Sequence, residues 1–123
     1  MNEPKKLIDT PSQTAGPFLH IGCAPRITGI NIFKSELGLT PFQDISDNEA
    51  INIKGKIYDG NGEPIIDAMI ETWQCDANGK YSSNQGFARI VTDFKTGEYQ
   101  LKTIRPGNKI NTDESLSASY ITF

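Results

Sequence analysis

Four short runs of aliphatic, β-branched and aromatic residues, separated by turn clusters, fill the stretch from Ile51 to Ile104. In the first run, Ile51, Ile53 and Ile57 alternate with polar residues, which is the two-residue period of a half-buried strand. The later runs are PIIDAMIETW, FARIVTD and EYQLKTI, which contain many residues that favour strands. Since no run keeps a helical period, the pattern predicts four strands, and this constrains the fold more than any other feature.

The clusters between these runs have the composition of tight turns. Asp59–Gly62 and Asp76–Gly79 combine glycine with aspartate and asparagine, whose side chains hydrogen-bond to nearby backbone, and FKTG supplies a third turn. Arg105-Pro106-Gly107 ends the fourth run, and SLSASYITF has strand character at the end of the sequence. Short strands with turns at fairly regular intervals predict an all-β fold, a transthyretin-like (prealbumin-like) β-sandwich.

The sandwich core is predicted at residues 50–123, after an N-terminal arm and an irregular connection over residues 1–49. Prolines punctuate the start of the arm, and because a residue before proline avoids the helical region, the arm is expected to be extended. Residues 27–49 are the least patterned part, and we expect a surface connection there. One short helical turn in it would involve Phe33, Leu37 and Leu39.

Composition excludes several classes of function. The 123 residues carry a net charge of -3 and 37% hydrophobic residues, as expected for one globular domain without a basic surface for nucleic acid. No apolar run approaches the roughly 20 residues that a membrane span needs. No secretion signal is readable, so the predicted location is the cytoplasm. In that reducing compartment Cys23 and Cys75 are expected to be free thiols, with a disulfide or a metal site as weaker alternatives.

Three segments carry a resemblance to a known family. TPSQTAGPF, GKIYDGNGEPIIDAMIETWQCDANGKY and TDFKTGEYQLKTIRPG, in this order, resemble the intradiol ring-cleavage dioxygenases, and most closely the α-type subunits of the protocatechuate 3,4-dioxygenase class. The resemblance covers nearly the whole chain except the connection. It implies a mononuclear non-haem Fe(III), catechol-type substrates such as protocatechuate, dioxygen, and a hetero-oligomer with a β-type subunit that carries the iron.

The resemblance also implies an iron site of two tyrosines and two histidines, a donor set that suits a hard cation. Tyr81 matches the first tyrosine position. No tyrosine follows Arg105-Pro106-Gly107 where the family has one, and SLSASYITF, which resembles the family's His-x-His strand, contains no histidine. We therefore expect no catalytic residue in this chain alone, Tyr81 as its only metal-ligand match, and Fe(III) on the β-type partner.

In the family the segment matching Thr14, Gly16 and Pro17 reaches the cleft between the subunits. The resemblance therefore implies that these three residues line the substrate pocket, where glycine permits close approach and proline fixes the backbone. The alternative is an arm that only covers a sheet edge. Arg105 is a candidate contact to substrate or partner. Trp73 is expected in the core, because an apolar run precedes it.

The leading functional hypothesis is an α-type subunit that does not bind iron and contributes pocket wall and subunit interface to an intradiol dioxygenase. The alternative is a transthyretin-like binding or interaction module, which fits the strands and turns equally well but not the N-terminal segment. A self-sufficient catechol dioxygenase is disfavoured by the missing ligands. The family α subunits continue beyond SYITF, so we expect either a truncated chain or a short subunit that relies on its partner.

Overall fold

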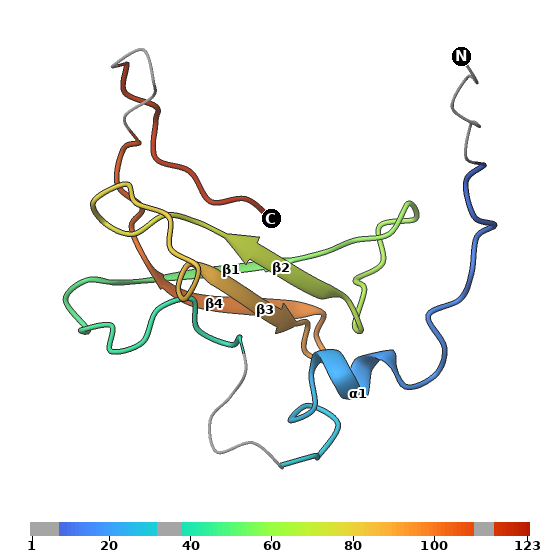
Figure 1. Ribbon diagram of the computed structural model, residues 1–123. Helices are drawn as coiled ribbons and strands as arrows, with labels where there is room; N and C mark the ends of the chain where they lie inside the picture. The colour runs from blue at the N-terminus through green and yellow to red at the C-terminus, as the bar shows by residue number, and fades with distance from the viewer. Residues whose placement is uncertain (1–7, 32–37, 110–114) are drawn as a thin grey trace, which may run out of the picture.

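The computed structural model describes residues 8–31, 38–109 and 115–123, and it confirms the all-β class. The four predicted strands are present and the turns fall between them (Figure 1). A short helix precedes the strands. The elements in chain order are α1 (Leu19–Cys23), β1 (Ala50–Lys56), β2 (Met69–Trp73), β3 (Phe87–Val91) and β4 (Glu98–Ile104).

The strands form two antiparallel pairs. β1 pairs with β4 in a register that places Ala50 opposite Ile104. β2 pairs with β3, with Met69 opposite Val91. Figure 1 shows the β2–β3 pair in front of the β1–β4 pair, and the core cluster contains residues of both pairs, so the two pairs pack face to face.

The core lies between the two pairs. Its fully or nearly buried apolar members are Ile70, Ala88, Ile90 and Leu101. Burial alternates along β2, so the outer face carries the other residues of that strand. Trp73 is one of them and is 38% exposed, so the prediction that it lies in the core is wrong. The reason is parity: with Ile70 buried, a residue three positions later on a strand faces the opposite side.

The three turns share one pattern of side-chain to backbone hydrogen bonds, as the sequence predicts. In each turn an aspartate Oδ1 accepts two backbone N–H groups, at 2.8 to 2.9 Å. A glycine with positive φ follows, so the left-handed position costs little strain. The three pairs are Asp59 with Gly62, Asp76 with Gly79, and Asp93 with Gly97.

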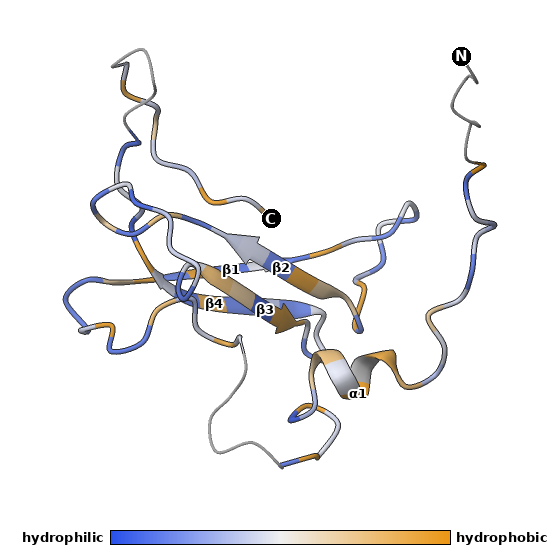
Figure 2. Cartoon of the chain, in the orientation of Figure 1, coloured by the Kyte–Doolittle hydropathy of each residue, from blue (hydrophilic) through white to orange (hydrophobic). Residues whose placement is uncertain are grey.

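The N-terminal arm departs from the extended prediction at α1. No proline follows Pro17 until the helix has ended, so the backbone is free to close a turn, and the Ile21 N–H donates to the Phe18 carbonyl at 3.1 Å. Residues 8–16 have no regular secondary structure. In the connection, Phe33 and Leu37 lie outside the described residues, whereas Leu39 packs against the core. Figure 2 shows hydrophobic residues around α1 and along β3, with hydrophilic residues in the turns.

Both outer edges of the β2–β3 pair are partly covered by other segments. Trp73 and Thr122 exchange two backbone hydrogen bonds of 3.0 Å, so SLSASYITF touches β2 through a single bridge rather than as a full strand. On the other edge, the Arg89 N–H donates to the Gly38 carbonyl. Arg89 is half-buried and forms an ion pair with Glu71 across the pair of strands.

Two further sequence predictions can be compared with the described residues. Cys23 and Cys75 are free, as predicted. Among the described segments, no helix has the length and apolar character needed to cross a bilayer.

Leu101 is completely buried at the centre of the core. We expect Leu101→Ala to lower the free energy of unfolding by about 2 to 5 kcal/mol, because the lost methyl groups leave a cavity. Urea unfolding measures this change. Leu116→Ala removes the same atoms from a side chain that is 66% exposed, and it should have little effect. Equal losses in the two variants would contradict the core assignment.

Candidate functional site

The end of β4 packs against the turn that precedes Tyr81. The Gly107 N–H donates to the Asp76 carbonyl at 2.8 Å. A Cβ atom on Gly107 would lie 2.3 Å from the Ala77 carbonyl oxygen, so a larger residue cannot occupy this position without moving the turn. The glycine of Arg105-Pro106-Gly107 is therefore explained by close packing, and this packing brings the end of β4 close to Tyr81.

Gln74 holds the two strand pairs together at the same end. Its side chain is 1% exposed, and its Nε2 donates to the Ile104 carbonyl at 3.0 Å. Its Oε1 accepts the Thr103 hydroxyl at 2.7 Å. Gln74 is not among the residues that the sequence motifs single out. The alternation of faces along a strand could have indicated its burial. Ile70, Thr72 and Gln74 occupy alternate positions, and all three are buried.

Tyr81 belongs to an aromatic cluster with Trp73 and Tyr120. Its ring stacks on Trp73 with a centroid separation of 5.8 Å, and its hydroxyl is hydrogen-bonded to the Tyr120 hydroxyl at 2.9 Å. The Lys109 ammonium lies 5.8 Å from the centre of the Tyr81 ring. Tyr120 comes from SLSASYITF, 39 positions after Tyr81, so two distant parts of the sequence meet here. Sequence analysis missed this cluster because stacking across segments leaves no local pattern.

The surroundings of Tyr81 favour its neutral form. The hydrogen bond with Tyr120, and to a smaller extent burial, raise the pKa of Tyr81 to about 12. A tyrosine binds a metal ion as its phenolate. Only a bound cation lowers the pKa of a phenol far enough for the phenolate to form at neutral pH. Among the described residues, the group that contacts the Tyr81 hydroxyl is a second phenol, that of Tyr120.

The residues around Tyr81 do not fit the Fe(III) centre of the family. That centre needs two phenolates and two imidazoles, whereas the side chains found beside Tyr81 are an indole, a phenol and an ammonium. An ammonium repels a metal cation rather than binding it. In residues 8–31, 38–109 and 115–123 no group of three or more His, Cys, Asp and Glu side chains could hold a metal ion. We therefore derive no chemical step through iron in this chain.

The other sequence-predicted site residues lie in two separate places. Thr14, Gly16 and Pro17 are exposed in the arm, where the Gly16 N–H donates to the Thr14 hydroxyl at 2.9 Å and Gly16 has a φ of 81°. Arg105 is exposed beside the turn that precedes Tyr81. In Figure 1 the blue arm lies at the right and the yellow loop that contains Tyr81 lies at the left. The structure thus does not bring the arm residues to Tyr81.

Comparisons with known proteins give consistent results. Residues 35–121 match the family profile Dioxygenase_C, described as Dioxygenase. The chain is 39% identical over 108 residues to the protocatechuate 3,4-dioxygenase alpha chain of Pseudomonas putida, covering 82% of this chain and 54% of that one. It is 32% identical over 119 residues to the alpha chain of the Burkholderia cepacia enzyme, covering 89% of this chain and 59% of that one. The chain thus spans a little over half the length of these relatives.

Among solved structures, 3-chlorocatechol 1,2-dioxygenase from Rhodococcus opacus 1CP has a similar fold. The TM-score is 0.58 at 21% sequence identity, and the match covers 68% of this chain and 41% of that one. At this identity the likeness concerns the fold alone.

Gln74→Met keeps the side-chain volume but removes the amide, leaving the Thr103 hydroxyl and the Ile104 carbonyl without their partner. We expect the free energy of unfolding to fall by about 1 to 3 kcal/mol, the usual cost of an unsatisfied buried polar group. Chemical denaturation measures the difference. Gln100→Met, at an exposed position of β4, is the matched control and should be nearly neutral. If both variants are equally stable, Gln74 does not join the strand pairs.

Tyr120→Phe removes the hydroxyl that holds the Tyr81 phenol neutral. The pKa of Tyr81 should then fall from about 12 toward its ordinary value of about 10. Because the folded pKa is raised, the stability that this pair contributes is complete below about pH 10 and is lost as the pH rises through about 12. NMR titration of the tyrosine rings measures the shift. Tyr58→Phe changes an exposed tyrosine outside the cluster, and a similar shift in that variant would contradict the assignment.

Proposed function

This chain belongs to the intradiol dioxygenase family, and we propose that it acts as an α-type subunit of a protocatechuate 3,4-dioxygenase-like enzyme. The observation that supports this most is the 39% identity to an alpha chain over 82% of the present chain. The family's reaction is the cleavage of a catechol between its two hydroxyl groups, with incorporation of O2. The alternative of a binding module without a catalytic partner has no comparable support.

The Fe(III) that the reaction needs belongs, in this proposal, to a β-type partner. The support is the set of side chains around Tyr81, an indole, a phenol and an ammonium, which includes no imidazole. No residue of this chain is assigned a catalytic role. Its share is a wall of the substrate pocket and a surface for the partner.

The pocket wall is assigned to Thr14, Gly16 and Pro17. All three are exposed, and the φ of 81° at Gly16 makes a tight bend before α1. Because glycine has no side chain, the backbone at this bend can approach a flat aromatic ring closely. Pro17 restricts the backbone, so less conformational entropy is lost when substrate binds. Arg105, at the opposite end of the strands, is the candidate contact to the partner. The separation of these two groups supports a site completed by a second chain rather than one enclosed by this chain.

Three finer assignments are part of the proposal. The transthyretin-like form of the sandwich is supported by two antiparallel pairs around one core. The division into an arm and irregular connection at residues 1–49 and a core at 50–123 is supported by the start of β1 at Ala50. A cytoplasmic location is supported by the two free cysteines, which suit a reducing compartment.

Co-expression with a β-type chain tests the proposal. We expect catechol-dependent oxygen uptake by the co-purified complex, with iron remaining on the β-type chain after the chains are separated. Gly16→Ala should raise the KM for the catechol about tenfold, because a non-glycine residue in the left-handed region costs about 1 to 2 kcal/mol.

Gly60→Ala is the control for this variant. It adds the same methyl group at an exposed turn position where a Cβ has no neighbour within 4 Å. Equal KM values for the two variants would remove Gly16 from the pocket. Iron bound stoichiometrically to this chain would overturn the subunit assignment.

A further inference from the structure

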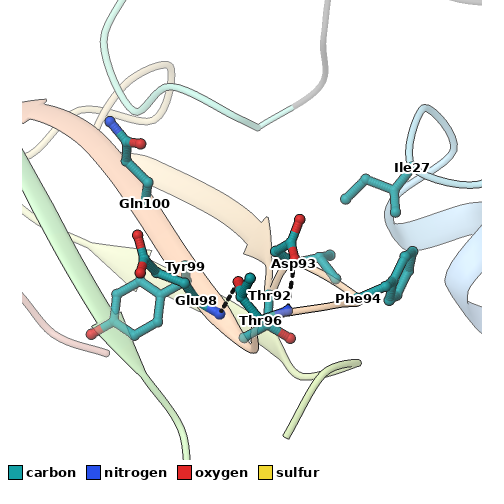
Figure 3. A pocket seen from close by; sticks show the side chains of 9 residues that line it. Ile27, Thr92, Asp93, Phe94, Thr96, Glu98, Tyr99 and Gln100 are labelled. Carbon is teal, nitrogen blue, oxygen red and sulfur yellow. Dashed lines mark hydrogen bonds between the residues drawn. The ribbon is translucent and has the colours of Figure 1, made fainter. Parts of the chain in front are cut away.

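A pocket lies at the end of the strands opposite to Tyr81, between the segment after α1 and the β3–β4 turn (Figure 3). Its volume is about 520 Å³, within the usual range of small-molecule sites. Neither the iron chemistry nor the Thr14–Pro17 pocket wall uses it. Its lining residues come from the segment after α1, from the end of β3, from the turn and from the start of β4, so it forms only where that segment meets the strands.

Apolar and aromatic side chains form two sides of the pocket. Ile27, from the segment after α1, and Phe94, from the turn, lie on one side in Figure 3, and Tyr99 lies on the other. Ile27 is 39% exposed and Phe94 is 50% exposed, so both present apolar surface to an occupant. Aromatic faces of this kind attract apolar groups and cations, whereas they repel anions.

Two of the nine lining residues are carboxylates and none is basic. In Figure 3 Asp93 lies between the two sides and Glu98 lies beside Tyr99. The ion pairs of the described part of the chain join other residues and leave both carboxylates out. The N–H groups of Thr96 and Lys95 hold the pKa of Asp93 below its usual value, so this carboxylate is charged at neutral pH.

Basic residues adjoin the pocket lining in the sequence, with Arg26 before Ile27 and Lys95 after Phe94. Lys95 follows Phe94 in the turn, and its charge adds a smaller effect on Asp93. Lys56 stands opposite Glu98 in the β1–β4 ladder, but no ion pair joins these two described residues. The pocket therefore combines apolar surface with negative charge that its own lining does not neutralise.

We propose that this pocket binds a small organic cation, an ammonium group on an alkyl or aryl body. The ammonium would lie against Glu98 and Asp93, and the apolar body would contact Phe94 and Ile27. An aromatic acid is excluded by the same charges, which separates this ligand class from anionic catechols. Because Ile27 belongs to the segment after α1, an occupant would also fix this segment to the β3–β4 turn.

Benzyltrimethylammonium is a suitable probe, titrated into the full chain and followed by amide chemical shifts. We expect saturable binding in the millimolar range, with shifts at Phe94, Thr96 and Gln100, and much weaker binding of neutral benzyl alcohol and of benzoate. Glu98→Gln should weaken the affinity for the cation about fivefold or more, since it removes one charge from the site. Ile27→Ala should weaken it as well, because it removes apolar surface from the pocket lining.

Glu63→Gln is the matched control, because it removes the same charge from an exposed position in the β1–β2 connection. The spectra also report whether each variant is folded. Equal binding of benzyl alcohol, or equal losses in the Glu98 and Glu63 variants, would overturn the proposal, since the first means a general apolar surface and the second a general charge effect. Unchanged affinity in Ile27→Ala would remove the segment after α1 from the site.

Discussion

The buried amide of Gln74 is the interaction on which the end of the sandwich that carries Tyr81 depends. Gln74 directly follows β2, and its side chain is hydrogen-bonded to the last two residues of β4, through the Thr103 hydroxyl and the Ile104 carbonyl. Apolar packing alone would hold the two strand pairs together without fixing how far one slides past the other, because the hydrophobic effect is not directional. Hydrogen bonds from a planar amide have defined distances and angles, so they fix this position.

The packing of Gly107 on the Asp76–Gly79 turn follows from that alignment. With the strand ends fixed, the loop after β4 passes so close to the turn that only glycine fits at position 107. The loop then continues to Lys109, and its cation lies over the Tyr81 ring. The cluster at Tyr81 is thus a consequence of backbone packing, and its second phenol comes from the chain segment that bridges to Trp73.

The two ends of the molecule have different properties. The Tyr81 end is aromatic and includes the Lys109 ammonium, whereas the pocket at the β3–β4 turn carries two carboxylates. The exposed arm residues lie on the side of α1 rather than of Tyr81 (Figure 1). This agrees with a subunit whose share of the substrate pocket is completed by another chain.

The sequence by itself determined the strands and the turns, because both depend on neighbours in the chain. Alternating isoleucines at Ile51 and Ile53 and the aspartate–glycine turns act over a few residues, and the structure has them where the sequence predicts. Tertiary structure alone decided the positions of Trp73, Gln74 and Tyr120. Trp73 is exposed because of strand parity, and Gln74 and Tyr120 find partners 29 to 39 positions away. Contacts over such separations depend on how the two strand pairs pack, which no local pattern encodes.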